Sequence, residues 1–110
     1  MRKRGRVCME TYDVVFSDEA KADLLDIVDY LNNFSIHIGV KYLDEIQQTV
    51  FSLAFMPQRC PFVRDDDLRQ KGYRWIFVRN YTIFFVIDEA KRIVDIRAIM
   101  YSGREYTALL

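Results

Sequence analysis

The chain has 110 residues, which is enough for one domain with a single core. Its hydrophobic fraction of 51% and aromatic fraction of 15% exclude an intrinsically disordered protein. The basic and acidic residues, 16 of each, cancel to a formal net charge of zero, so bulk charge provides no attraction for nucleic acid.

The first residues of the chain differ in composition from the rest. Residues 2–6 are mostly basic, and only a short apolar stretch follows before Glu10, too short for the core of a secretory signal. We therefore expect a cytoplasmic protein. We predict a flexible basic extension over residues 1–11 and a single domain over residues 12–110.

The first half of the domain predicts one strand and two helices. Residues 12–16 alternate between faces in the manner of a short strand. Ser17 offers a hydroxyl that can cap a helix, and apolar residues at helical spacing continue to Leu31. A break over residues 32–35 precedes a second apolar helical stripe, which Pro57 stops. Two such helices form a hairpin whose apolar stripes need a sheet or each other as cover.

The second half predicts a loop and a sheet. Residues 58–71 lack any periodicity, so we predict a surface loop there. Strands follow at about 74–78, 81–87 and 92–100, with connections short enough to force antiparallel pairing. The predicted fold class is therefore α+β, with an N-terminal strand, a two-helix hairpin and a three-stranded antiparallel meander forming one sheet.

The last strand indicates that the sheet has two different faces. Asp95 and Arg97 alternate with apolar residues, so they should lie on a face that is partly open to solvent. The opposite face should be core against the helices, and it would carry Val94, Ile96, Ala98 and Met100.

A set of arginines forms the candidate functional site. They come from different strands and strand ends, and we predict that they converge on the open face as a target-binding surface: Arg74, Arg79, Arg97 and Arg104. Guanidinium groups bind phosphates through bidentate hydrogen bonds, so such a cluster would suit a polyanion. The alternative is that they are ordinary polar residues of a wet sheet face, with Arg97 in a surface ion pair with Asp95 or Glu105.

The residues give little support to disulfides, a metal site, histidine-based catalysis or a phosphate-binding glycine loop. Cys8 and Cys60 have neither the number nor the spacing of a disulfide framework or a zinc site, so we interpret them as free thiols. His37 has no nucleophile or ligand set beside it, and the glycines form no phosphate-binding loop. We expect no metal and no cofactor.

Stretches along almost the whole domain follow the pattern of a known family. Residues 17–27 carry an Ala-x-x-Asp-Leu-x-x-Ile helix, residues 68–74 lead into the meander, and residues 81–85 with 96–105 close it. In this order and length they resemble the RelE/ParE superfamily of toxins from bacterial type II toxin–antitoxin modules. The resemblance runs from Tyr12 to the C-terminus.

The resemblance implies a toxin that arrests growth and is neutralised by a cognate antitoxin protein. RelE-like members are ribosome-dependent endoribonucleases that cut mRNA, whereas ParE-like members poison DNA gyrase. The implied partners are therefore an antitoxin and either gyrase or the ribosome with its mRNA, without a membrane. The assembly would be a dimer or a toxin–antitoxin hetero-oligomer. A third alternative is a member that has lost toxicity and only binds its antitoxin as a co-repressor.

The resemblance also assigns roles to single residues. In a nuclease, Arg74 and Arg104 would be catalytic cations on the phosphate, and Tyr101 or Tyr106 would be the acid or base. Thr82 occupies the position where RelE-like enzymes carry an arginine after the tyrosine of the middle strand. This departure removes a cation from the transition state and favours a ParE-like function, as does the acidic balance of the chain beyond its basic start.

Overall fold

The computed structural model describes residues 11–103, 106 and 110. The helices are α1 (Asp18–Asn32), α2 (Ile36–Ser52), the 3₁₀ turn η1 (Pro57–Arg59) and α3 (Asp66–Gln70). The strands are β1 (Asp13–Phe16), β2 (Tyr73–Val78), β3 (Tyr81–Asp88) and β4 (Ile93–Tyr101). This order of elements confirms the predicted α+β fold. Nearly all of the predicted basic extension lies outside the described residues.

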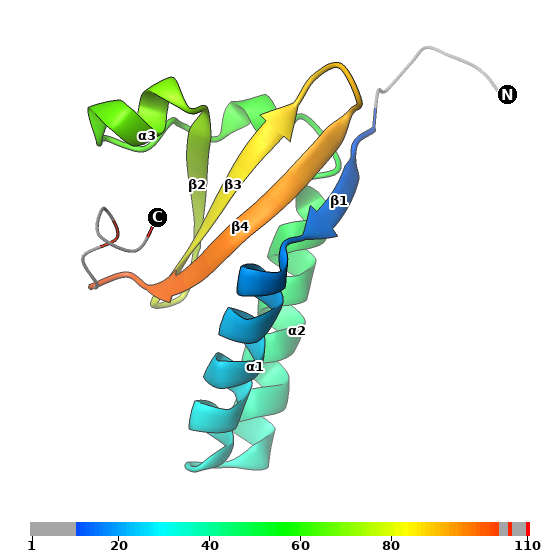
Figure 1. The fold of residues 1–110 in the computed structure, drawn as a ribbon. Coiled ribbons are helices and arrows are strands. Elements are labelled where there is room, and N and C mark those ends of the chain that lie inside the picture. Colours follow the sequence, from blue (N-terminus) through cyan, green and yellow to red (C-terminus); the bar gives the residue numbers. More distant parts are fainter. Residues whose placement is uncertain (1–10, 104–105, 107–109) are drawn as a thin grey trace, which may run out of the picture.

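All strands belong to one sheet with the order β1-β4-β3-β2. The meander strands pair antiparallel, whereas β1 pairs in parallel with β4, the last strand of the chain. Between these two parallel strands the chain forms the helical hairpin, η1, α3 and the strands β2 and β3. Figure 1 shows α1 and α2 side by side, extending past the end of the sheet.

Both long helices begin at serine caps. The Ser17 hydroxyl accepts a hydrogen bond from the Ala20 N–H at 3.1 Å, as the sequence predicted. The Ser35 hydroxyl accepts one from the His37 N–H at 3.1 Å and starts α2. The second helix ends at Ser52, before the proline that we expected to stop it. In the described part of the chain, no helix has the length and apolar character needed to cross a membrane.

The main core lies between the helical hairpin and one face of the sheet. Ala20 of α1 is fully buried in it, and fully buried members from α2 and the central strands include Ile46, Val50, Ile83, Phe85, Val94 and Ile96. Apolar residues at alternate positions of β1 pack on the same cluster, so the period-two pattern of residues 12–16 is confirmed.

The opposite face of the sheet is not open as predicted, because it carries a second apolar cluster. Phe84 is 2% exposed, and Leu68 of α3 packs with it. Tyr106 and Leu110 from the end of the chain also pack on this cluster. Other members are Val63, Ala98, Met100, Tyr73 and Trp75.

A β-bulge in β4 explains why the predicted division of its side chains is wrong. Phe84 pairs with Ala98 and Phe85 pairs with Ile96, which leaves Arg97 as an extra residue without a partner in the register. Beyond the bulge the alternation is shifted by one residue. Val94 and Ile96 therefore face the helices, but Ala98 and Met100 face the second cluster, and Ile99 takes their place in the main core.

The prediction of a structureless loop over residues 58–71 is also wrong in part. Asp65 accepts a hydrogen bond from the Leu68 N–H at 3.1 Å and so caps the short helix α3. The two acidic residues after this cap lie in the first turn, where the helix dipole favours negative charge. The aspartate run therefore starts a helix, and Leu68, which is 3% exposed, anchors it to the sheet.

Phe85→Ala should strongly destabilise the fold. It removes a ring with 0% exposure from the main core, so we expect the free energy of unfolding to fall by about 3–5 kcal/mol. Phe77→Ala is the matched control, because Phe77 lies in the neighbouring strand and is 55% exposed. Its cost should stay below about 1 kcal/mol. Urea unfolding followed by Trp75 fluorescence measures both values, and equal losses would contradict this core assignment.

Candidate functional site

Arg74 lies on β2 at the edge of the sheet and faces the side of the helices. It pairs with Phe85 in the register. Its Nη1 donates hydrogen bonds to the backbone oxygens of Cys60 at 2.6 Å and Gln58 at 3.2 Å. Its guanidinium also lies 3.9 Å from the centre of the Phe62 ring, in a cation–π contact. Arg74 therefore fastens the segment after η1 to the edge of the sheet.

A polar cluster beside this segment joins parts of the chain that are distant in sequence. The Tyr12 hydroxyl donates to Glu89 Oε1 at 2.6 Å, and Gln58 Nε2 donates to the Tyr12 hydroxyl at 2.6 Å and to Glu89 Oε1 at 3.1 Å. The bond from Tyr12, followed by that from Gln58, lowers the pKa of Glu89, and the bond to the carboxylate raises the pKa of Tyr12. No sequence motif signals this cluster, because its members meet only in the fold.

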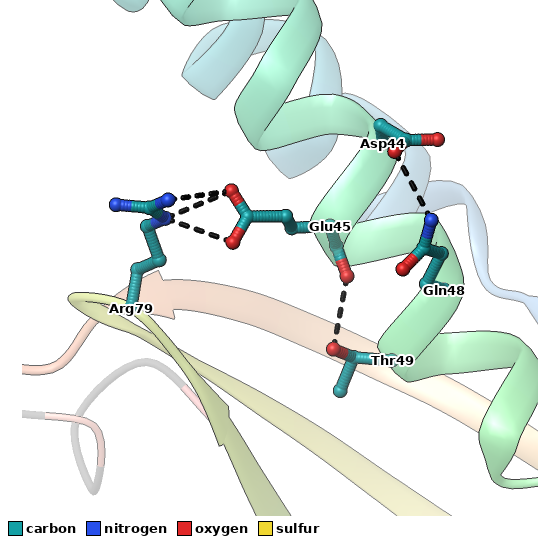
Figure 2. Close-up of polar contacts among 5 residues, drawn as sticks. All are labelled: Asp44, Glu45, Gln48, Thr49 and Arg79. Carbon is teal, nitrogen blue, oxygen red and sulfur yellow. Dashed lines mark hydrogen bonds and ion pairs between the residues drawn. The ribbon is translucent and has the colours of Figure 1, made fainter.

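Arg79 lies in the turn between β2 and β3 and reaches α2 (Figure 2). Its Nε lies 3.0 Å and 2.9 Å from the two carboxylate oxygens of Glu45, and its Nη2 lies 2.8 Å from Oε2. The guanidinium also lies 4.9 Å from the centre of the Tyr42 ring. The hydrogen bond from Arg79 lowers the pKa of Glu45, and burial opposes this shift. Arg79 therefore links the hairpin turn to the helices.

Arg97 is the bulge residue of β4 and lies on the sheet face away from the main core. Its Nη1 forms an ion pair with Asp95 Oδ2 at 2.9 Å, which confirms the alternative that it pairs on the surface. The Asp95 carboxylate, followed by the Tyr73 hydroxyl, raises the pKa of Arg97. Arg97 also lines a hollow of about 410 Å³ together with Tyr73 and the acidic residues Glu19 and Asp23.

The predicted convergence of the arginines on one open face is therefore wrong. Arg74 and Arg79 lie towards opposite ends of β2 and contact groups on the helix side, whereas Arg97 lies on the other face. The register of β2 and the bulge in β4 decide these directions. Arg104 falls outside the described residues, and the functional roles assigned to the arginines stay predictions.

The candidate tyrosines line one hollow, but the Tyr101 ring contacts Tyr81 on the helix side, whereas the Tyr106 ring packs on the second cluster. Tyr101 and Tyr106 both line a hollow of about 190 Å³ on the face away from the main core. The Tyr106 ring packs against Trp75 and Phe84 at centroid distances of 5.6 Å and 5.2 Å. Thr82, which is 4% exposed, lines the same hollow, and its hydroxyl lies 2.9 Å from that of Ser102. The described residues around this hollow include no basic side chain.

Comparison with known proteins decides the family. A sequence profile for the "ParE toxin of type II toxin-antitoxin system, parDE" matches residues 14–106. The chain belongs to this ParE toxin family. The earlier resemblance to the RelE/ParE superfamily is thereby confirmed. A comparison with curated proteins finds no significant match.

Solved structures share the fold of this ParE-family chain. The RelBE2 toxin–antitoxin complex from Mycobacterium tuberculosis matches with a TM-score of 0.63 and 19% identity, covering 83% of this chain and 98% of that chain. The chromosomal ParDE system from P. aeruginosa matches with a TM-score of 0.68 and 17% identity, covering 84% of this chain and 97% of that chain. At these identities the likeness establishes the fold alone.

Arg74→Met should expose the Cys60 thiol in this ParE-family chain. The substitution keeps an apolar stem but removes the hydrogen bonds to the backbone before β2, and we expect thiol labelling to accelerate about tenfold. Burial raises the pKa of Cys60, and the Arg74 charge partly lowers it. Losing this charge by itself would slow labelling, so faster labelling must report opening of the segment.

The labelling experiment uses a Cys8→Ser background, so that Cys60 is the reporter. Arg64→Met is the matched control, because Arg64 is exposed on the same stretch of chain and should leave the labelling rate unchanged. An unchanged or slower rate in Arg74→Met would show that Arg74 does not hold this segment closed.

The Arg79–Glu45 pair should contribute stability that depends on pH. Because the folded-state pKa of Glu45 is lowered, the contribution is fully present above the unfolded pKa of about 4.3. It is lost as the pH falls through the lowered folded-state value. A double-mutant cycle with Arg79→Gln and Glu45→Gln, measured by urea unfolding, should give a small favourable coupling at about pH 7 and none at about pH 2.

Asp44→Asn provides the control for this cycle. Asp44 lies next to Glu45 on α2 and accepts a hydrogen bond from Gln48 at 3.1 Å (Figure 2). The Asp44→Asn substitution therefore removes a nearby negative charge without changing a partner of Arg79. The Arg79–Glu45 coupling should survive this substitution. A coupling that persists at the low pH would show that it does not arise from the ion pair.

Proposed function

We propose that the chain is the toxin of a type II toxin–antitoxin module, that a cognate antitoxin neutralises it in the cytoplasm, and that its target is DNA gyrase. Membership of the ParE toxin family supports the toxin class. The choice of gyrase rests on the positions of the basic side chains.

The observation that carries the choice of target is the engagement of the arginines in internal contacts. A nuclease needs cations close to the charge that develops on the scissile phosphate. Here Arg74 donates to backbone oxygens, and Arg79 and Arg97 form ion pairs with carboxylates. Thr82 stands where a nuclease of the superfamily would carry a further arginine, and its hydroxyl pairs with Ser102. This arrangement favours a toxin that acts on a protein.

An mRNA endoribonuclease remains the second candidate, on one specific observation. Tyr101 and Tyr106, the candidate acid and base, line the same hollow. Arg104 follows β4 closely in the sequence and would be the phosphate-binding cation, with Arg74 as the further catalytic residue in this alternative. Tyr101 is 55% exposed, so a substrate can reach this residue.

Exposed apolar side chains on the helical hairpin support an antitoxin partner. They include residues with exposed fractions between 59% and 69%, namely Leu25, Tyr30, Phe34, Ile36, Val40 and Phe51. Exposed apolar surface on this scale is typical of a binding surface. An antitoxin tail that folds on binding would bury part of it. We expect a toxin–antitoxin hetero-oligomer, with a dimer of the chain as the alternative assembly.

Induced expression without an antitoxin should arrest growth, and purified protein should then trap DNA breaks by gyrase on a supercoiled plasmid. Parallel reactions with programmed ribosomes test the nuclease. Cleavage of mRNA without an effect on gyrase would overturn the proposed target and support the second candidate. Normal growth at confirmed expression would reject the toxin and leave a co-repressor that binds its antitoxin.

Arg104→Ala should abolish growth arrest, because it removes a basic side chain to which we assign binding of the target. Arg64→Ala is the matched control, since it removes an exposed arginine elsewhere on the surface and should arrest growth like the parent chain. Equal expression of both variants is verified by immunoblot. Full growth arrest by Arg104→Ala would remove Arg104 from the target-binding and catalytic surface.

A further inference from the structure

A groove of about 310 Å³ lies between α1 and α2, the two helices that lie side by side in Figure 1. None of its described lining residues belongs to β2, β3 or β4. Leu25 of α1 and Phe51 of α2 both line the groove, and they are 66% and 61% exposed. The remaining lining is apolar except for Lys21 and Gln47. The hairpin therefore presents apolar side chains on a side that the meander does not cover.

The apolar wall on α2 continues beyond the groove as a straight stripe. Residues at steps of four, seven and four share one side of a helix, and here they are Ile36, Val40, Gln47 and Phe51. Ile36 is 69% exposed and Val40 is 60% exposed. The stripe is about 22 Å long at 1.5 Å per residue. Together with Leu25 it is the outer face of the hairpin. A straight stripe of this length suits a partner helix, whose own apolar residues recur at the same spacing.

Carboxylates lie on the same side of α1 as Leu25. Asp18 precedes Leu25 by two turns, and Asp29 follows it by one. Both are exposed, and neither forms an ion pair within the described chain. Lys21 lies one turn after Asp18 and balances it in part, whereas no basic residue of α1 lies one turn from Asp29. The negative charge of the outer face is therefore least balanced at Asp29.

The charge of the whole hairpin has the same sign. Residues 18–52 contain seven acidic and two basic residues. Two of the acidic residues are engaged elsewhere, because Glu45 is bound by an arginine and Asp23 accepts a hydrogen bond from the backbone of β4. The other five are all exposed, and they outnumber the two lysines, Lys21 and Lys41. The negative sign therefore depends on neither Asp23 nor Glu45.

This charge decides which occupant fits the outer face. A second copy of the chain would bring two negative hairpins together, and an anionic membrane surface would repel the same carboxylates. An acidic helix is disfavoured for the same reason. A helix whose apolar stripe is flanked by lysines or arginines buries the apolar residues and pairs with the carboxylates in one contact.

We propose that the outer face of the hairpin binds a basic amphipathic helix of the antitoxin, and the choice of the antitoxin as its source rests on the proposed function. Leu25 and Phe51 contact the apolar stripe of this helix. A lysine or arginine beside that stripe pairs with Asp29. The apolar contacts supply most of the affinity, and the charges select a basic helix over an acidic one.

The test is a fluorescence anisotropy titration of the full chain with labelled helical peptides of about 15 residues, the length of the stripe. One peptide carries leucines at helical spacing flanked by lysines. A second has the same leucines flanked by glutamates, and a third has the residues of the first in scrambled order. The second and third should bind at least about tenfold more weakly than the first. Equal binding of the first peptide and either of the others would overturn the proposal.

Variants locate the binding site on the hairpin. Asp29→Lys should weaken the lysine peptide about fivefold and strengthen the glutamate peptide, because it reverses the charge beside Leu25. Phe51→Ala should weaken the lysine peptide about tenfold by removing an apolar contact. Asp67→Lys and Phe77→Ala are the matched controls, since both residues are exposed outside the hairpin, and they should bind like the parent chain. Equal weakening by the controls would overturn the assignment to the outer face.

The growth assay and the titration fail independently. Growth arrest without charge-dependent peptide binding would reject the outer face as a site for a basic helix and leave the toxin assignment standing. Charge-dependent binding in a chain that does not arrest growth would support the outer face and reject the toxin. A dimer of the free chain in sedimentation equilibrium that is lost in Phe51→Ala would assign the face to a second copy and overturn the proposal.

Discussion

The burial of adjacent phenylalanines on opposite faces of β3 is the constraint on which both halves of this molecule depend. Phe85 closes the main core against the helical hairpin, and Phe84 closes the second cluster under α3 and the end of the chain. A central strand that is buried on both sides cannot shift its register without moving both cores. The β-bulge opposite these rings allows β4 to serve both cores with one continuous strand.

This double burial determines where the arginine side chains can lie. An open sheet face could have displayed them as one basic surface, but the second cluster occupies much of that face. The arginines are instead attached to the periphery of the core, where Arg74 fastens the edge of β2 and Arg79 fastens the hairpin turn to α2. The guanidinium groups of Arg74, Arg79 and Arg97 thus bind backbone oxygens or carboxylates of the same chain. These contacts are the basis on which we propose a protein target rather than a reacting phosphate.

The binding potential that remains lies on the helical hairpin. Its tip extends past the sheet, so apolar side chains there find no strand to cover them (Figure 1). A cleft at its base is lined by Asp23 and Asp26 and by the rings of Tyr30, Tyr42, Tyr81 and Tyr101. Exposed apolar surface of this kind is typical of a binding surface for another protein.

The sequence by itself determined the two long helices, the strands, their order and the family. The Ser17 cap, helical spacing and short strand connections act between residues close in the chain, so they predicted α1, α2 and the meander correctly. Only the tertiary structure decided where functional side chains lie. The bulge at Arg97, the contacts of Arg79 with Glu45 and of Tyr12 with Glu89, and the cleft all depend on register and packing between distant segments. No local pattern encodes such contacts, because a shift of one residue in a strand turns every later side chain to the other face.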